Sequence, residues 1–422
     1  MSEILDFYQQ QANAARLPVA WLAELQTKAL NEFKRCGFPG RHQEDWKYTT
    51  VDPFLQHHFA TAASGYAGGQ IKTDLPFEQE VVIANGEIMP GAQQLANLPA
   101  GVIVKPLIQA AVEHEELLKP YLNQLLTQEH GFHALNLAAL RTGIFIYLPE
   151  NACVDDPIVL AHWQDKEDQA VYARHVIIAE TGSKATIIES YQGAPACRYF
   201  TNTVTEVHTA PDAKIIHYKI QRESKAAFHI GHLAVKQDSA SQFDSHSLSL
   251  GGRLVRSDAS FRLQGGKAQC LLNGVYMPAN GQHVDHHTTV YHEVANCQST
   301  QDYKGILNGS SKAVFNGKVV VARDAQKTQA AQQNKNLLLS AKAEIDTKPQ
   351  LEIYADDVVC SHGATVGQLD EDALFYLATR GIGRHEASQF LVSAFAADNL
   401  RLVPDAYMAG WMADLINQQL EG

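Results

Sequence analysis

One short stretch of the sequence combines a thiol and an imidazole at a spacing that suits metal binding. Cys360 and His362 lie two residues apart in the segment YADDVVCSHGATVG, residues 354–367. In an extended chain both side chains point to the same face, with Cα atoms about 6.6 Å apart. A thiolate and an imidazole suit a soft or borderline metal, but two ligands do not complete a tetrahedral site. The missing ligands would come from a second chain or a bound cluster. The alternative is a buried cysteine beside a polar histidine at a strand end.

Two carboxylates in the same segment suggest a different chemistry. Asp356 and Asp357 could act as general acid and base in polysaccharide hydrolysis on a β-solenoid. Adjacent residues of a strand point to opposite faces, which weakens this pair. A carbohydrate-active enzyme is therefore kept only as an alternative, because nothing in the sequence indicates secretion.

A histidine cluster forms a second candidate metal site, with the pattern H-x-x-H-H-x-x-x-x-H. On a strand, His283 and His287 would share one face, while His286 and His292 would share the other. The pleat thus divides the cluster. Solvated imidazoles on the wet face of a sheet explain the pattern without a metal, and a zinc or iron site is the alternative.

Several common catalytic motifs are absent from the sequence. It contains no G-x-x-x-x-G-K-[ST], no H-E-x-x-H and no G-x-S-x-G. Gly381 and Gly383 do not complete a dinucleotide fingerprint, because Glu386 stands where the third glycine belongs. These absences exclude the usual ATP, NAD, zinc-protease and serine-hydrolase sites.

The segment that carries Cys360 and His362 ends a long β-rich region. From about residue 150, β-branched or alternating runs such as RHVIIAE, KATIIESY and AVFNGKVVVA follow one another, separated by turn residues at roughly even intervals. Regular spacing without intervening helices excludes βαβ folds and leaves a sandwich, a propeller or a β-solenoid. The length of the region favours the solenoid.

Helical patterns flank this region on both sides. Residues 1–40 are expected to be helical, residues 41–54 an ordered loop, residues 61–69 a flexible connection and residues 106–128 helical again. Near the end, Asp370 should cap a helix that Gly381 stops, and the next helix carries an apolar stripe. The expected domains are a mixed N-terminal domain 1–150, a solenoid 151–367 and a helical domain 368–422. The stripe either packs internally or docks another protein, and its members are Ala387, Phe390, Leu391, Ala394 and Phe395.

Composition narrows the function further. The 422 residues are 45% hydrophobic and 19% charged, and 34 Lys and Arg against 46 Asp and Glu give a net charge of −12. This charge argues against nucleic acid as a partner. Glu3 and Asp6 do not fit a signal peptide, so a cytoplasmic protein without membrane spans is expected. The cysteines are scattered and are expected to be reduced thiols; they are Cys36, Cys153, Cys197, Cys270, Cys297 and Cys360.

Residues 334–382, NKNLLLSAKAEIDTKPQLEIYADDVVCSHGATVGQLDEDALFYLATRGI, resemble the C-terminal signature of the SufB/SufD family of iron–sulfur cluster assembly proteins. RHQEDWKYT, residues 41–49, resembles the family's N-terminal element, so the likeness spans nearly the whole chain. The stretch SHGAT, residues 361–365, is similar to the SufD branch, whereas SufB carries a glutamate-flanked histidine there. The resemblance implies a right-handed parallel β-helix between helical terminal domains.

The resemblance also implies partners and a role. It implies a non-enzymatic scaffold subunit that pairs with SufB through β-helix edges and binds the ATPase SufC through its C-terminal helical domain. His362 would help to hold a transient iron–sulfur cluster shared with SufB, with Cys360 as a further candidate ligand. No cofactor is expected in the isolated chain, which would form a homodimer without SufB, and the resemblance does not specify whether the complex binds flavin. A SufB-like direct cluster carrier is a further alternative, which would need more cysteines near the interface.

Overall fold

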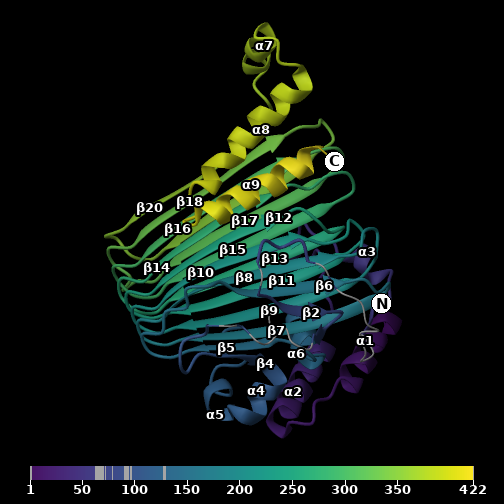
Figure 1. Ribbon diagram of the computed structural model, residues 1–422, viewed down its shortest axis with the longest axis vertical. Helices are drawn as coiled ribbons and strands as arrows, with labels where there is room; N and C mark the ends of the chain where they lie inside the picture. The colour runs from purple at the N-terminus through teal and green to yellow at the C-terminus, as the bar shows by residue number, and fades with distance from the viewer. Residues whose placement is uncertain are drawn as a thin grey trace.

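Two mainly parallel β-sheets, each with one antiparallel pair at its first turn, face each other and form a β-solenoid of about eight turns (Figure 1). The computed structural model describes residues 2–61, 71, 73–77, 79–89, 95, 97–126 and 130–421. Successive strands of the chain alternate between the sheets, so each turn stacks on the previous one. This confirms the predicted mainly β fold.

The first sheet contains strands that follow the odd numbers from β5 onward, and the second contains the even numbers from β6 onward. The first sheet consists of β1 (Ala60–Thr61), β4 (Ile103–Pro106), β5 (Ile144–Leu148), β7 (Gln169–Ala179), β9 (Phe200–Thr209), β11 (Phe228–Gln237), β13 (Leu254–Leu263), β15 (His283–His292), β17 (Lys312–Val321) and β19 (Glu344–Ile353). The second consists of β2 (Val81–Ala84), β3 (Glu87–Ile88), β6 (Ile158–Gln164), β8 (Lys184–Gly193), β10 (Lys214–Arg222), β12 (Gln242–Ser249), β14 (Gln269–Tyr276), β16 (Gln298–Leu307), β18 (Gln329–Leu338) and β20 (Val359–Gly367).

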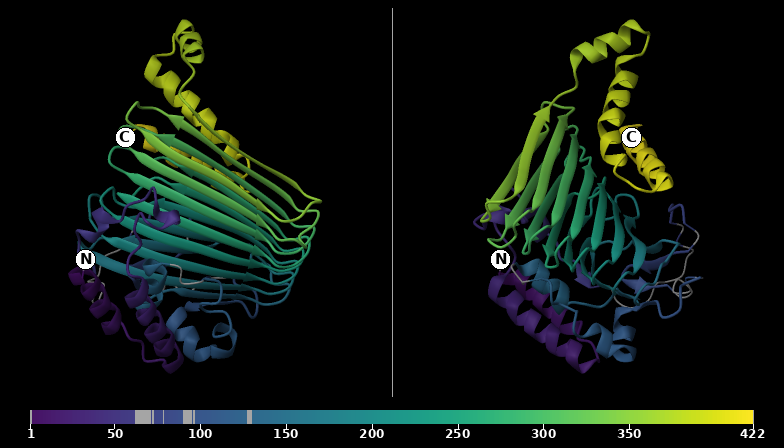
Figure 2. Two further views of the ribbon diagram at one scale, coloured as in Figure 1. Left: turned by 180° about the vertical axis from the view of Figure 1, so that it is seen from behind. Right: turned by 90° about the vertical axis from the view of Figure 1, so that its left-hand side faces the viewer.

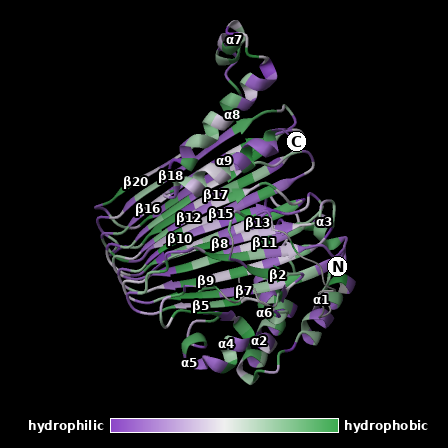
Figure 3. Ribbon diagram, viewed as in Figure 1, coloured by the Kyte–Doolittle hydropathy of each residue, from purple (hydrophilic) through white to green (hydrophobic). Residues whose placement is uncertain are grey.

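The strands alternate between apolar residues that fill the space between the sheets and residues that face outward. Val207, Phe243 and Phe261 belong to this central core. Hydrophobic and hydrophilic bands accordingly alternate along the strands in Figure 3. The short corners reverse the chain through left-handed residues, among them Asp212 with φ 60° and Asn296 with φ 65°. Asn and Asp tolerate this conformation better than other non-glycine residues, which explains their use at the corners.

Helices cover the first turns of the solenoid on the outer face of the first sheet. They bury an aromatic cluster that includes Phe54, Phe200 and Phe228. Strand β9 is therefore buried on both faces. The elements outside the sheets in this region are α1 (Ser2–Ala14), α2 (Ala20–Cys36), the 3₁₀ turn η1 (Glu44–Trp46), α3 (Asp52–Leu55), α4 (Leu107–Glu113), α5 (Glu115–Leu118) and α6 (Gly131–Ala138).

A buried ion pair fastens this helical region to the solenoid. Glu206 on β9 lies 2.7 Å from Arg174 on β7, and both side chains are fully buried. Glu206 also accepts hydrogen bonds from the backbone N–H groups of Asn123 and Gln124. A buried carboxylate needs several donors of this kind, because an unpaired charge in the interior is costly.

Three N-terminal expectations need correction, and one helix was missed. Residues 1–40 form two helices rather than one, because the chain leaves the helical conformation before Ala20. The expected loop 41–54 contains η1 and α3, and the helix expected over 106–128 is divided into α4 and α5. Most of the expected connection 61–69 lies outside the described residues. Helix α6 was not expected.

At the other end, α7 (Glu371–Thr379), α8 (Arg384–Leu400) and α9 (Ala406–Glu421) follow β20. Helices α8 and α9 lie along the outer face of the second sheet, while α7 projects beyond the solenoid (Figures 1 and 2). As predicted, the Asp370 carboxylate caps α7 by accepting from the N–H groups of Asp372 and Ala373, and Gly381 takes φ 86° after it. Helix α9 lies within the predicted helical domain 368–422, although no separate helix was predicted there. None of the helices in the described ranges has the length and apolarity that crossing a bilayer requires.

Candidate functional site

The last turn of the solenoid leaves both sheets with a strand that is paired on one side only. Strand β19 pairs with β17 and β20 pairs with β18, and within the described part of the chain neither has a second neighbour. β20 is mostly exposed, in contrast to β9. The right-hand view of Figure 2 shows this open end. Unpaired strand edges offer backbone donors and acceptors to another chain.

The register places Cys360 and His362 on the same face of β20, as the sequence indicates. Cys360 pairs with Ala330 of β18, and His362 pairs with Gln332. Ala330 and Gln332 are both buried, so their neighbours on β20 continue the inner face of the sheet at its open end.

Cys360 and His362 differ in their surroundings. Cys360 is partly buried against Val319 and Ala330, and burial raises the pKa of its thiol above the usual value. A metal must therefore displace the thiol proton before Cys360 can act as a ligand. His362 is exposed at the end of the solenoid. Its imidazole is available to a ligand outside this chain without rearrangement of the core.

Gln332, beside His362, is a buried amide with both polar atoms unpaired among the described residues. Its exposed fraction is 3%. Unsatisfied buried amides are costly and call for a partner that is not part of the isolated chain. The inner face of the open end thus combines a thiol, an imidazole and an unsatisfied amide.

Asp356 and Asp357 lie in the exposed turn between β19 and β20. Asp356 accepts a hydrogen bond of 2.9 Å from the Gln326 side chain, and Gln326 in turn accepts from the Asp357 N–H. A general acid in a glycosidase needs a shielded site that raises its pKa. These two carboxylates have solvent around them, which weighs against the hydrolase alternative.

The four histidines of β15 lie on the faces that the pleat predicts. His286 and His292 face inward and are buried. The prediction that these imidazoles lie on a solvated face of the sheet is therefore wrong for these two residues. Each has a protein partner, with His286 3.2 Å from the Ser249 hydroxyl and His292 2.8 Å from the Ser299 hydroxyl.

On the outer face, His283 lies 2.9 Å from Thr49 and His287 lies 3.1 Å from Asp285. Each of the four histidines thus contacts a protein side chain, although Nδ1 of His292 has no hydrogen-bond partner among the described residues. Within the part of the chain that the structure describes, this pattern does not bring three ligand atoms together for a metal ion.

The apolar stripe on α8 divides between two environments. Ala387 is fully buried, whereas Phe390 is 64% exposed and Ala394 is exposed. Leu391 and Phe395 are half-buried. The residues that fix α8 to the second sheet include two that the sequence analysis did not single out, Val392 and Ala396, which are buried in the cluster under the C-terminal helices.

Polar anchors also hold α8 on the solenoid. The Asn399 amide donates to Oδ1 of Asn273 at 2.7 Å and to the Asp302 carbonyl at 2.9 Å. Lys304 donates to the Asp398 carboxylate at 2.9 Å. The helix is therefore anchored at its C-terminal half, while its N-terminal half and α7 extend away with exposed aromatic side chains. Phe375, Tyr376 and Phe390 are 71%, 57% and 64% exposed.

Comparison with known proteins identifies the family. The model described as "SUF system FeS cluster assembly, SufBD core domain" matches residues 162–395, and the model described as "SufBD protein N-terminal region" matches residues 1–160. The chain therefore belongs to the SufB/SufD family of iron–sulfur cluster assembly proteins.

Individual relatives agree with this assignment. The Escherichia coli "Iron-sulfur cluster assembly protein SufD" is 33% identical over 408 residues, which cover 93% of this chain and 92% of the relative. A Synechocystis "Iron-sulfur cluster assembly SufBD family protein" is 30% identical, over 90% of this chain and 87% of the relative. Bacillus subtilis SufD is 25% identical, over 91% of both chains. These relatives are named as assembly proteins.

Proposed function

We propose that this chain is a non-enzymatic scaffold subunit that pairs with SufB and helps to hold a nascent iron–sulfur cluster at the junction. The observation that carries the proposal is the open end of the solenoid, where β19 and β20 each have one unpaired edge among the described residues and His362 is exposed. Pairing of such edges would extend both sheets across the interface and shield side chains at the junction from water. In the absence of SufB, the same edges would pair two copies of this chain.

The side-chain donors at the open end are too few to bind a cluster within one chain, and they fit a cluster that is shared with a second chain. His362 offers an imidazole and Cys360 a thiol that burial keeps protonated. Iron–sulfur clusters are held by thiolates and, in some centres, by histidines. One chain supplies two donors here, so SufB would supply the others, and the cluster would be transient cargo rather than a resident cofactor. The proposal does not specify whether the complex binds a flavin. The proposed compartment is the cytoplasm.

The projecting helices α7 and α8 are proposed as the docking site for the ATPase SufC. Phe375 and Tyr376 on α7 and Phe390 on α8 are exposed aromatic side chains on two helices that leave the solenoid. Large exposed aromatic side chains in one region are typical of protein interfaces. Because α8 is also anchored on the second sheet through Asn399, an ATPase bound to its outer half could move the solenoid end when it changes conformation.

A proline at the edge of β20 should weaken pairing without breaking the solenoid. The Val359 N–H donates to the carbonyl of Thr328, the residue before β18, at 2.9 Å. Since successive N–H groups of a strand point to opposite sides, the N–H of Ala364 points to the free edge. Strand β19 already contains a proline, Pro349, at the corresponding position. The Glu344 N–H donates to the Ser311 carbonyl of the preceding turn, so by the same alternation the backbone nitrogen of Pro349 faces the free edge. A proline is tolerated there because no hydrogen bond within the chain is lost.

For Ala364→Pro we expect about tenfold weaker association with SufB, and dissociation of the homodimer when the chain is alone, as measured by sedimentation velocity. One lost backbone hydrogen bond and the added ring account for this magnitude. Ala364→Val keeps the N–H and is the matched control. Unchanged association of Ala364→Pro, or a wild-type chain that neither dimerises nor binds SufB, would reject pairing through this edge.

A further inference from the structure

A polar cavity of about 610 Å³ lies on the outer face of the first sheet, beneath the N-terminal segment Gln43–Trp46. Its walls come from outward-facing side chains of β11 through β19, from this segment and from the start of α6. His130, His133, His232 and Asp258 are among the residues that line the cavity. These residues lie in the first sheet and at the start of α6, with His130 directly before the helix, whereas His362 lies in the second sheet at the last turn.

Three of these side chains converge. One ring nitrogen each of His130 and His133 and one carboxylate oxygen of Asp258 all lie within 4.8 Å of one another. His130 is the residue before α6 and His133 is in its first turn, so their spacing of three residues places both on one side of the helix. The two rings are 3.7 Å apart between centroids. Asp258 is on β13, so the group joins a helix to the solenoid.

The histidine nitrogens have no partners that would explain their burial. His130 and His133 are 7% and 6% exposed. Among the described residues, neither nitrogen of His130 has a hydrogen-bond partner, and Nδ1 of His133 also lacks one. Three unsatisfied buried nitrogens in one place are costly, which calls for a ligand.

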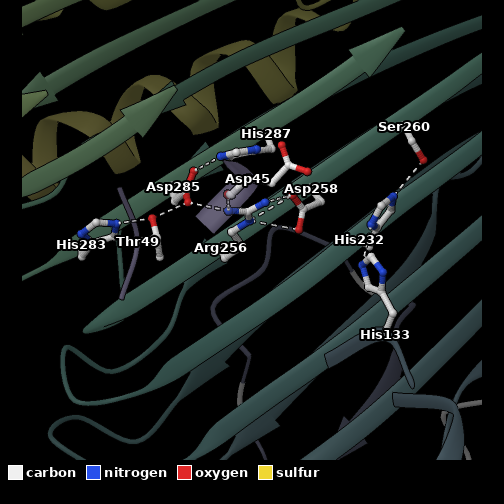
Figure 4. A network of polar contacts seen from close by, with 10 residues as sticks. All are labelled: Asp45, Thr49, His133, His232, Arg256, Asp258, Ser260, His283, Asp285 and His287. Atoms are coloured by element: carbon white, nitrogen blue, oxygen red, sulfur yellow. Dashed lines mark hydrogen bonds and ion pairs between the residues drawn. The ribbon is translucent and has the colours of Figure 1, made fainter. Parts of the chain in front are cut away.

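A hydrogen-bonded chain fixes the orientation of His133. Its Nε2 lies 2.9 Å from Nδ1 of His232, and Nε2 of His232 lies 2.8 Å from the Ser260 hydroxyl (Figure 4). When Nε2 of His133 donates to His232 and His232 donates to Ser260, Nδ1 of His133 keeps a free lone pair. Metal-binding histidines commonly use one nitrogen as ligand and donate with the other in this manner.

The charges around Asp258 favour a cation despite the neighbouring arginine. Arg256 donates to both carboxylate oxygens of Asp258, with Nη2 2.9 Å from Oδ1 and Nε 3.2 Å from Oδ2, and also to Asp285 at 2.9 Å (Figure 4). Two buried carboxylates thus face one guanidinium, and the guanidinium lies over the Trp46 ring, 4.2 Å from its centre. An ionised carboxylate has about four lone-pair positions, so Asp258 can accept from Arg256 and still coordinate a metal.

We propose that His130, His133 and Asp258 bind a divalent transition metal such as Fe²⁺ or Zn²⁺, with the remaining positions open to the cavity. Two imidazoles and one carboxylate form a ligand set that suits Fe²⁺ and Zn²⁺ and does not suit Mg²⁺ or Ca²⁺, which prefer oxygen. Bonds of about 2.0–2.2 Å require ligand atoms closer than 4.8 Å, so modest side-chain rotation completes the site. The site is independent of pairing at the open end.

Titration of the full chain with Co²⁺ tests this site, because Co²⁺ replaces Zn²⁺ or Fe²⁺ and reports its coordination by visible absorption. We expect one Co²⁺ per chain with a spectrum of nitrogen and oxygen ligands and no thiolate charge-transfer band. His130→Gln and His133→Gln should each weaken binding at least tenfold, and the exposed His385→Gln should not change it. A wild-type chain that binds no Co²⁺ would overturn the proposal and would identify the cavity as hydrated space.

Two further measurements keep this test separate from folding and from the open end. The double variant Cys360→Ser/His362→Ala should retain the Co²⁺ site, and loss of binding in that variant would assign the metal to β20 instead. Added Zn²⁺ should raise the melting temperature of the chelator-treated wild type, since a ligand that binds only the native state stabilises it. If His130→Gln does not fold, Asp258→Asn is tested in its place. If Zn²⁺ raises the melting temperature of the folded variants as much as that of the wild type, the assignment is contradicted.

Discussion

Replacing His362 by alanine is expected to leave the chain folded and paired with SufB, yet to reduce the yield of iron–sulfur cluster at least tenfold. The side chain is exposed at the end of the solenoid, so its removal should change the free energy of unfolding by less than about 0.5 kcal/mol. Loss of even an outer-shell partner of a metal ligand typically costs 10- to 100-fold in metal affinity, and loss of a ligand should cost no less. Anaerobic reconstitution with and without SufB, followed by visible absorption, measures the effect.

The exposed His385→Ala is the matched control, because it removes an imidazole of the same kind from α8. Cys360→Ser in the same assay tests the thiol separately. Full cluster yield with His362→Ala would show that this imidazole is not a ligand, whereas a failure to fold would assign it a structural role.

Phe390→Asp is expected to prevent capture of SufC. Phe390 is 64% exposed and contributes little to the core, so the variant should fold normally. Truncation of a central aromatic residue of an interface typically costs about 2–4 kcal/mol, which corresponds to roughly 30- to 1,000-fold in affinity, and a buried carboxylate adds to that loss. Pull-down with SufC and titration calorimetry measure the change.

Val112→Asp is the control for this experiment, because Val112 is 67% exposed on α4, in the N-terminal part of the chain. Phe395→Asp is a poorer test, since the Phe395 ring is covered by Lys304 at 4.6 Å and its loss would disturb the packing of α8. Equal SufC binding by the wild type and Phe390→Asp would remove this surface from the proposal.

The solenoid was predictable because its signals are local. Strand alternation and regular corners are visible in the sequence, and a period of two determines that Cys360 and His362 share a face. The cap at Asp370 was predictable for the same reason, since an N-cap depends on the next three residues.

Features that depend on long-range packing were not predictable. His130 and His133 are more than 120 residues from Asp258 in the sequence, and only the docking of α6 on the first sheet brings them together. The closely spaced histidines of β15 gave the stronger sequence signal but have ordinary protein partners. The H-x-x-H spacing of His130 and His133 was a weak signal that could have been found. Likewise, helical periodicity placed Ala387 and Phe390 on one apolar stripe, although Ala387 is buried and Phe390 is exposed.

A photo-cross-linker at Val359 tests pairing through the open end most directly. Val359 begins β20 and is 73% exposed in the isolated chain. The account predicts a cross-link to SufB in the mixed complex and to a second copy when the chain is alone, with no cross-link from the same group at Val112. A SufB complex that forms without any cross-link from Val359 would contradict it.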